Sequence, residues 1–168
     1  MSSDVDVKTI RRDFPILSRR LGSHPLVYLD SANTSQKPES VIDAVDRHYR
    51  EHNANVARAM HALGSEATQA YEGARARIAG FIGAAGPDEV VFTKNASEAL
   101  NLAAGTLGAR LGPGDEVVVS VLEHHSNLVP WQRAAKKTGA VLEYMYVDKE
   151  TGRLPEEELK KIDDPRVK

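Results

Sequence analysis

The sequence predicts an α/β fold with a mainly parallel sheet, and three observations favour it. Short apolar runs such as "EVVVSVL" and "AVLEYMYV" alternate with stretches whose apolar residues recur at helical spacing. Clusters of glycine and proline, such as "GAAGPDE" and "GPGD", separate these runs. A chain of 168 residues is also long enough to bury the core of one layered domain. Strands that alternate with helices are typical of parallel sheets.

The first half of the chain is expected to be mostly helical. Apolar residues at positions 41, 42, 45 and 49 lie on one face of a helix that begins at Pro38. Ser65 is the expected N-cap of the longest helix, with Glu66 in its first turn. The expected elements are a short helix over 6–14, a buried strand over 25–30, the helix from Pro38, a loop over 52–65 and a helix over 65–82.

The second half predicts a regular alternation of strand and helix. The expected elements are a strand over 90–93, a helix from Ser97, a turn and strand within 112–122, a helix from near Asn127 to Gly139, a strand over 140–147, and a helix over 154–162 with Glu and Lys four residues apart. The alternation then calls for another strand. Either a small domain ends at this point, or these residues are the front part of a longer protein.

Composition narrows the possible functions. Hydrophobic residues make up 41% and charged residues 27%, as in ordinary globular proteins. The net charge of −2 does not favour binding of nucleic acid, and no stretch is apolar enough to span a membrane. The N-terminus is too charged for a secretory signal, so we expect a cytoplasmic protein. The absence of cysteine excludes disulfides and a thiol nucleophile within these residues.

A polar turn, "TKNAS", separates the expected strand over 90–93 from the helix that follows. In α/β sheets, ligands collect where strands end and helix N-termini expose free N–H groups. Ala96 would let the backbone approach an anion, and Ser97 would add a hydroxyl donor. Equally, Asn95 or Ser97 could simply cap the helix, with Glu98 favourable near its positive end. The spacing alone leaves both interpretations open.

The segment "LEHHSN" (122–127) lies at the end of the next expected strand. In an extended chain, Glu123 and His125 would share one face and His124 the other. Both histidines are therefore poorly placed for one metal ion, and we expect no metal site. One imidazole could lie over a flat ligand held at the neighbouring turn, or both could be polar residues that close a strand.

Two further loops contain candidate residues. The loop "DSANTS" (30–35) follows the expected strand over 25–30 and could line a cleft or begin a helix. Arg58 and His61 lie in the loop over 52–65, where such side chains are often solvated, although loops also carry function.

Four segments together carry a family resemblance: "VYLDSANTSQKP", "NANVARAMHAL", "FTKNASEALN" and "EHHSNLVPWQ". In this order and at these distances, they resemble the N-terminal part of group II (SufS-type) cysteine desulfurases, within the class V aminotransferase superfamily. The resemblance covers nearly all of the chain. It implies the fold type I architecture of enzymes that depend on pyridoxal 5′-phosphate. The chain would then comprise an N-terminal helical segment, 1–24, and an incomplete large domain, 25–168.

The resemblance also implies an activity and the residues that serve it. Such enzymes convert L-cysteine to alanine and an enzyme-bound persulfide, which passes to an acceptor or scaffold protein of iron–sulfur cluster assembly, and they act as homodimers. Carried over, Ala96 and Ser97 would bind the cofactor phosphate. His124 would stack on the cofactor ring as a catalytic residue. Ala32, Asn33 and Arg58 would bind substrate.

The sequence departs from the family pattern in several places. The Schiff-base lysine, in its usual serine/threonine-glycine-histidine-lysine setting, is absent, and so is the persulfide cysteine. Ala57 and Ala59 replace a histidine and a glycine of the family, and Asn33 replaces an alanine. The first two departures fit the front portion of a longer enzyme. The alternatives are a non-catalytic homologue that binds a full-length desulfurase, or a related class V enzyme such as a selenocysteine lyase.

Overall fold

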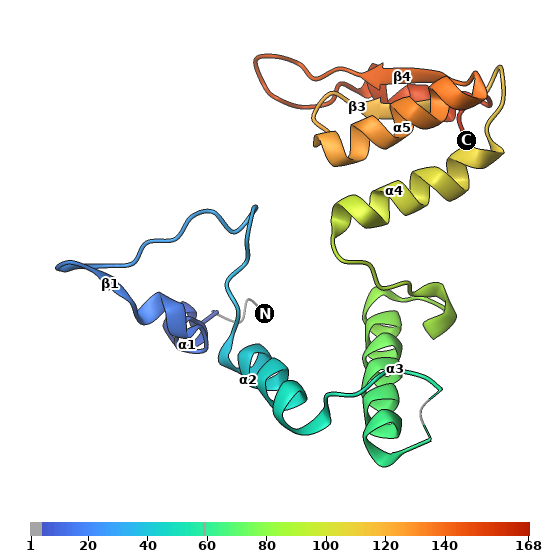
Figure 1. Ribbon diagram of the computed structural model, residues 1–168. Helices are drawn as coiled ribbons and strands as arrows, with labels where there is room; N and C mark the ends of the chain where they lie inside the picture. The colour runs from blue at the N-terminus through green and yellow to red at the C-terminus, as the bar shows by residue number, and fades with distance from the viewer. Residues whose placement is uncertain (1–4, 59) are drawn as a thin grey trace. The chain divides into compact units, whose positions relative to one another are not determined.

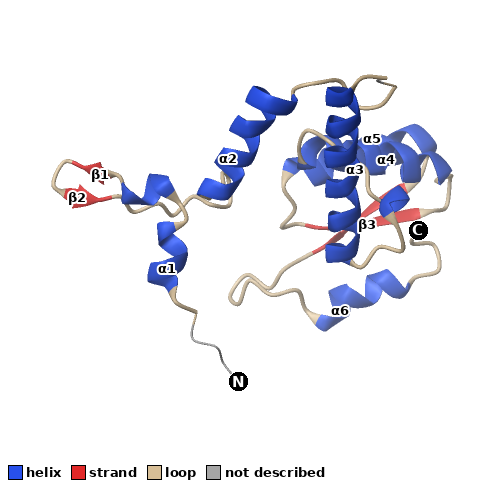
Figure 2. Cartoon of the chain, turned by 90° about the horizontal axis from the view of Figure 1, so that it is seen from below, coloured by secondary structure: helices blue, strands red, loops and turns tan. Residues whose placement is uncertain are grey.

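The computed structural model describes residues 5–58 and 60–168. They fall into two compact units that divide after Val90, and each unit is described by itself (Figure 1). Each unit contains one two-stranded sheet, drawn in red in Figure 2.

The first unit is mainly helical. Helix α1 begins where the Asp6 carboxylate accepts hydrogen bonds from the N–H groups of Lys8 and Thr9, as an N-cap does. Helix α2 begins directly after Pro38, as expected, and its N-terminal Glu39 N–H donates to the Asp13 carbonyl. The elements are α1 Val7–Arg12, the 3₁₀ turn Pro15–Ser18, β1 Arg20–Leu21, β2 His24–Pro25, α2 Glu39–Arg47, the π-helical turn His48–His52, α3 Ala62–Ile82 and the 3₁₀ turn Pro87–Glu89.

Helix α3 begins earlier than expected. The prediction that Ser65 caps this helix was wrong, because the Nδ1 atom of His61 accepts from the Gly64 N–H at 3.2 Å and takes the N-cap position. Ser65 therefore lies inside the helix. The C-terminal end agrees with expectation: Gly83 follows Ile82 with φ of 72°, a left-handed conformation that glycine adopts without strain.

Two expected strands form no ladder in the described residues. Only Pro25 of the segment over 25–30 belongs to a strand, and the Leu26 N–H still donates to the Arg19 carbonyl at 2.9 Å. Residues 27–30 lie outside any ladder, with Val27 and Leu29 exposed by 73% and 92%. The segment over 90–93 is likewise outside any sheet. An apolar run shows that a segment can form a strand, but a strand also needs a neighbour that supplies its hydrogen bonds. Both predictions were wrong for this reason.

The second unit contains the expected parallel strands. It consists of α4 Ala96–Leu107, the 3₁₀ turn Gly108–Arg110, β3 Glu116–Ser120, α5 His125–Thr138, β4 Val141–Met145, α6 Glu156–Leu159 and the 3₁₀ turn Lys160–Asp163. Strands β3 and β4 pair in parallel, from Glu116 opposite Val141 to Ser120 opposite Met145. Helix α5 makes the crossover between them, as parallel pairing requires.

A small core joins the sheet to the helices. The buried apolar side chains of this unit include Ala104 of α4, Val117 and Val119 of β3, and Pro130 and Ala135 of α5. At the end of α4, a Cβ added to Gly108 would lie 2.8 Å from the Ala134 Cβ, so a glycine is needed where the two helices approach. Valines at alternate positions bury one face of β3, which fixes its register.

The last helix is shorter than expected. Helix α6 covers only four residues and continues as a 3₁₀ turn, instead of one helix over 154–162. Its ion pair joins Glu158 and Lys161 at 2.7 Å, three residues apart and not four. The Lys161 ammonium also donates to the Tyr144 carbonyl of β4, which ties this turn to the sheet.

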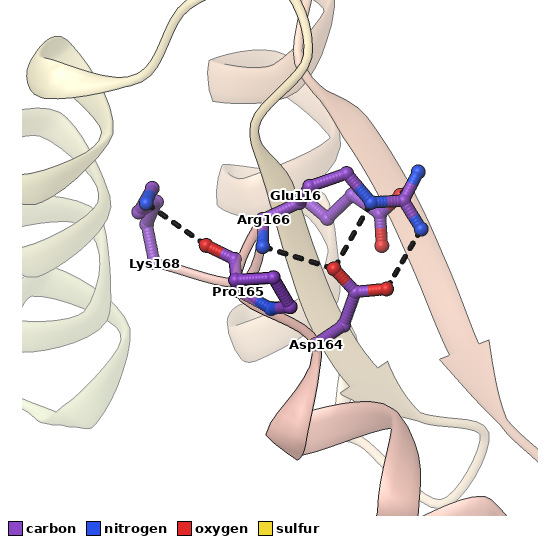
Figure 3. A network of polar contacts seen from close by, with 5 residues as sticks. All are labelled: Glu116, Asp164, Pro165, Arg166 and Lys168. Atoms are coloured by element: carbon purple, nitrogen blue, oxygen red, sulfur yellow. Dashed lines mark hydrogen bonds and ion pairs between the residues drawn. The ribbon is translucent and has the colours of Figure 1, made fainter.

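Residues 164–168 lie beside the start of β3. The Glu116 N–H donates to the Arg166 carbonyl at 2.8 Å, and the Lys168 N–H donates to the Glu116 carbonyl at 3.1 Å. These bonds form a parallel bridge between Glu116 and Val167. Figure 3 shows the side-chain contacts of the same segment. One edge of β3 thus pairs with β4, and its other edge is partly covered by the end of the chain.

Candidate functional site

The turn before α4 has a reciprocal cap. The Asn95 Oδ1 atom accepts from the Glu98 N–H at 2.9 Å, and the Glu98 carboxylate accepts from the Lys94 N–H at 2.6 Å. The capping interpretation of this turn is therefore correct for Asn95, with Glu98 as its partner. Ser97 is not the cap.

This cap leaves two donors free. Ala96 and Ser97 are exposed first-turn residues of α4, and no described residue accepts from their backbone N–H groups. These N–H groups lie at the positive end of the helix, where an anion is stabilised. The cap and the predicted phosphate cradle are thus compatible, because they use different residues. The backbone donors and the Ser97 hydroxyl fit a phosphate.

His124 is the N-cap of α5. Its Nδ1 atom accepts from the Ser126 N–H at 3.1 Å and lies 2.8 Å from the Ser126 hydroxyl oxygen. A backbone N–H is always a donor, so Nδ1 must be the acceptor, and the neutral ring carries its proton on Nε2. The exposed ring is therefore held at one nitrogen while its other nitrogen offers a donor.

The expected strand geometry at the two histidines was wrong. Strand β3 ends at Ser120, and His125 is the first residue of α5, which begins two residues before the expected Asn127. The alternation of faces along an extended chain therefore does not apply to them. Their rings lie with centroids 6.2 Å apart, tilted by 49°.

A network of side-chain hydrogen bonds connects the end of β3 to α5 around the turn that contains His124. The Ser120 hydroxyl donates to Glu123 Oε1 at 3.0 Å, and the Asn127 amide donates to Glu123 Oε2 at 2.7 Å. The indole N–H of Trp131 donates to Asn127 Oδ1 at 3.1 Å. Sequence reasoning missed this network, although the spacing of 123, 127 and 131 is the four-residue spacing of helix neighbours.

The predicted cofactor-binding residues Ala96, Ser97 and His124 all lie in the second unit, at the same end of it. Helices α4 and α5 pack against each other and run in the same direction, so their N-terminal ends lie at the end of the sheet where β3 finishes (Figure 1). Ala96 and Ser97 begin one helix, and His124 precedes the other. Ligands of open α/β sheets bind at this carboxyl end of the strands.

The substrate-binding candidates belong to the first unit. Ala32 and Asn33 lie in an exposed turn in which the Asn33 N–H donates to the Asp30 carbonyl at 3.2 Å. The Tyr28 hydroxyl lies 2.6 Å from the Thr34 carbonyl and closes the turn. This loop is thus a defined turn, and the alternative that it begins a helix is not observed, since α2 begins at Glu39.

Arg58 lies in a strained segment. Ala57 and Arg58 have φ of 63° and 53°, values that side chains other than glycine seldom adopt. The Ala57 N–H donates to the Thr68 hydroxyl of α3 at 2.9 Å, which holds the segment against that helix. Ala59, the second departure of this loop, lies outside the described residues.

Other features of the described residues lie apart from these candidates. A groove of the second unit runs along the α4–α5 contact, past Gly105 and Ala134, and includes none of the predicted site residues. Among residues 5–58 and 60–168, no cluster of three metal-ligating side chains is found. Within the same ranges, no helix combines the length and apolar character of a membrane span.

Comparison with known proteins identifies the family. The aminotransferase class-V family model matches residues 27–168. A probable cysteine desulfurase from Synechocystis sp. is 52% identical over 143 residues, which cover 84% of this chain and 34% of that protein. A cysteine desulfurase from Haloferax volcanii is 49% identical over an alignment that covers 99% of this chain and 42% of that protein. The chain thus spans well under half the length of these relatives.

Solved structures agree with the sequence relatives. An apo cysteine desulfurase from Thermococcus onnurineus superposes with a TM-score of 0.83 and 40% identity, over 96% of this chain and 38% of that one. A cysteine desulfurase from Escherichia coli gives 0.75 and 37% identity, over 96% and 39% of the two chains. The expected α/β architecture of fold type I is confirmed by these matches. The chain belongs to the aminotransferase class-V family.

Proposed function

We propose that the chain is the N-terminal portion of a pyridoxal phosphate-dependent cysteine desulfurase. The observation that carries this proposal is the pair of free N–H groups at Ala96 and Ser97, at the same end of the unit as His124. Relatives named as cysteine desulfurases support the reaction class. L-cysteine is then the substrate, and alanine and enzyme-bound sulfur are the products.

The residues divide between binding and proton handling. The backbone of Ala96 and the backbone and hydroxyl of Ser97 donate to the cofactor phosphate, and the helix end favours its charge. Bound pyridoxal phosphate supplies the electron sink for bond breaking at the substrate. The imidazole of His124 packs against the cofactor ring and holds a proton at Nε2, ready for transfer at the substrate.

Substrate contacts are assigned to the first unit. Ala32, Asn33 and Arg58 bind substrate in this proposal, with the Arg58 guanidinium as the donor for an anionic group. The strain at Ala57 and Arg58 supports a functional role, because strained backbone persists where surrounding contacts hold it. Thr68 supplies such a contact through the Ala57 N–H.

The finer assignment follows the group II resemblance. We assign the protein to the SufS type, as a cytoplasmic homodimer that passes sulfur to an acceptor of iron–sulfur cluster assembly. The Schiff-base lysine and the persulfide cysteine would be supplied by sequence outside these 168 residues, in which cysteine does not occur.

One experiment tests the proposed activity. The full-length gene product, purified with pyridoxal phosphate, is incubated with L-cysteine and a thiol reductant, and alanine and sulfide are measured together. We expect equimolar alanine and sulfide. Parallel incubation with L-selenocysteine separates the lyase alternative: a protein that releases selenide but no sulfide is a selenocysteine lyase. Cofactor binding without either product contradicts the proposed activity, and no cofactor binding favours the non-catalytic homologue.

A further inference from the structure

Both oxygens of the Glu123 carboxylate, next to His124 in sequence, accept hydrogen bonds from side chains. Its two oxygens accept from Ser120 Oγ at 3.0 Å and from Asn127 Nδ2 at 2.7 Å. Ser120 is buried, at the last position of β3, and its hydroxyl oxygen also accepts from the Leu122 N–H at 3.2 Å. The carboxylate therefore joins the end of the strand to the first turns of α5.

Asn127 extends this link into the helix. While its amide nitrogen donates to Glu123, its amide oxygen accepts from the Trp131 indole N–H at 3.1 Å. The Asn127 amide is thereby fixed in one orientation, because each end of the amide faces a partner of only one kind. A chain of partly buried hydrogen bonds runs from β3 to the second turn of α5.

His124 lies within this closed loop. It follows Glu123 directly in sequence and precedes Asn127 by three residues, so it lies in the segment that the hydrogen bond between Glu123 and Asn127 spans. Its own hydrogen bond to the Ser126 N–H fixes the ring relative to the helix. The direction of the ring relative to the sheet then depends on the link from Glu123 to Ser120 and Asn127.

We propose that Glu123 and Asn127 are positioning residues that hold the His124 imidazole in the orientation needed to pack on the cofactor. This inference rests on the proposed function, and it assigns roles to two residues that neither touch the phosphate nor transfer the proton. A carboxylate is suited to this task because it accepts hydrogen bonds from Ser120 and Asn127 at the same time, and its charge strengthens both bonds. A ring that is held in advance loses less entropy when the cofactor binds.

The donor and acceptor of the central pair can be exchanged to test this. Asn127→Asp places a second carboxylate against Glu123 but can still accept from Trp131, so it breaks only the central bond. Glu123→Gln combined with Asn127→Asp restores that bond with reversed direction, while the glutamine oxygen still accepts from Ser120. This double variant keeps the net charge of the wild type, because one carboxylate is removed and one is added. Gln132→Ala is the matched control, because it removes another α5 hydrogen bond, the one to the Tyr144 hydroxyl.

Three measurements are made on each variant of the full-length protein. Backbone hydrogen exchange of the cofactor-free protein reports on the turn over 121–127. Circular dichroism of the bound cofactor in the visible region reports on the orientation of its ring, and a titration gives its dissociation constant. We expect Asn127→Asp to speed exchange in this turn, to change the visible dichroism and to weaken cofactor binding about 10-fold. The double variant should recover all three, and Gln132→Ala should resemble the wild type.

The outcomes separate this inference from the proposed function. Asn127→Asp could speed hydrogen exchange in the turn while the visible dichroism and the cofactor affinity stay unchanged. That result would show that the network has only a structural role, and it would overturn the inference. The same holds if the double variant fails to recover, or if Gln132→Ala has an equal effect. A wild-type protein that binds the cofactor but does not release sulfide contradicts the proposed activity and leaves these positioning measurements valid. A wild type that binds no cofactor overturns both.

Discussion

The guanidinium of Arg166 joins Glu116 and Asp164. Its Nη1 atom lies 2.7 Å from Glu116 Oε1, and its Nη2 atom lies 2.8 Å from Asp164 Oδ2 (Figure 3). Glu116 is the buried first residue of β3, and its backbone also pairs with residues 166–168. A buried carboxylate is stable only with such a partner, so this contact fixes the residues that follow α6 against the sheet.

This arrangement predicts an acid-dependent loss of stability. Hydrogen bonds from the Arg166 side chain and backbone lower the pKa of Asp164 from 3.8 to about 2. Because the folded-state pKa is depressed, the charged carboxylate stabilises the fold above pH ~4, and this contribution is lost as the pH falls toward ~2. Asp164→Asn should lower the urea midpoint at pH 5 and differ little from the wild type at pH 2. An equal difference at both pH values would contradict the assignment.

The end of α5 predicts a cost for one alanine substitution. Gly139 has φ of 78°, and a Cβ added there would lie 3.3 Å from the Pro113 Cγ. Gly139→Ala should therefore destabilise the protein by about 1–2 kcal/mol, the cost of a left-handed residue with a side chain. Gly73→Ala in the middle of α3 is the control, because nothing lies within 4 Å of its added Cβ. There alanine should stabilise by about 0.5–1 kcal/mol. Urea unfolding measures both, and a neutral Gly139→Ala would contradict the argument.

The free N–H groups of α4 predict an effect of charge on cofactor affinity. Ser97→Asp places a carboxylate in the first turn, where it favours the helix but repels a phosphate. We expect unchanged or slightly higher thermal stability of the apo protein and at least about 10-fold weaker binding of pyridoxal phosphate. Ser97→Ala, which keeps the backbone donors, should weaken binding less. If both variants bind as the wild type does, the phosphate lies elsewhere.

The two histidines should differ in their effect on the cofactor spectrum. His124→Ala removes both the cap of α5 and the ring, whereas His124→Asn retains a capping oxygen and removes only the ring. Both should change the visible absorption of the bound cofactor. His125→Ala should change it less, because His125 is the first residue of the helix and does not form the cap. A normal spectrum in His124→Asn would limit His124 to its capping role.

Local signals in the sequence determined most of the helices and the parallel pair. The continuous apolar run "EVVVSVL" marked β3, and Gly139 marked the end of α5, because both features act within a few residues. The turn at Asn95 was also recognisable, since a capping side chain bonds to its own helix. The family resemblance came from the same segments, and the family match over residues 27–168 confirmed it.

Tertiary structure decided what local patterns leave open. The runs over 25–30 and 90–93 have the composition of strands, yet pairing depends on residues far away in the sequence, and no described segment forms a ladder with residues 27–30 or 90–93. The hydrogen bonds around His124 could not be predicted from the sequence either. The link from Ser120 through Glu123 to Asn127 depends on where β3 ends and where α5 begins. Capping and periodicity are properties of neighbouring residues, whereas sheet edges and hydrogen-bond networks arise from how the chain folds back on itself.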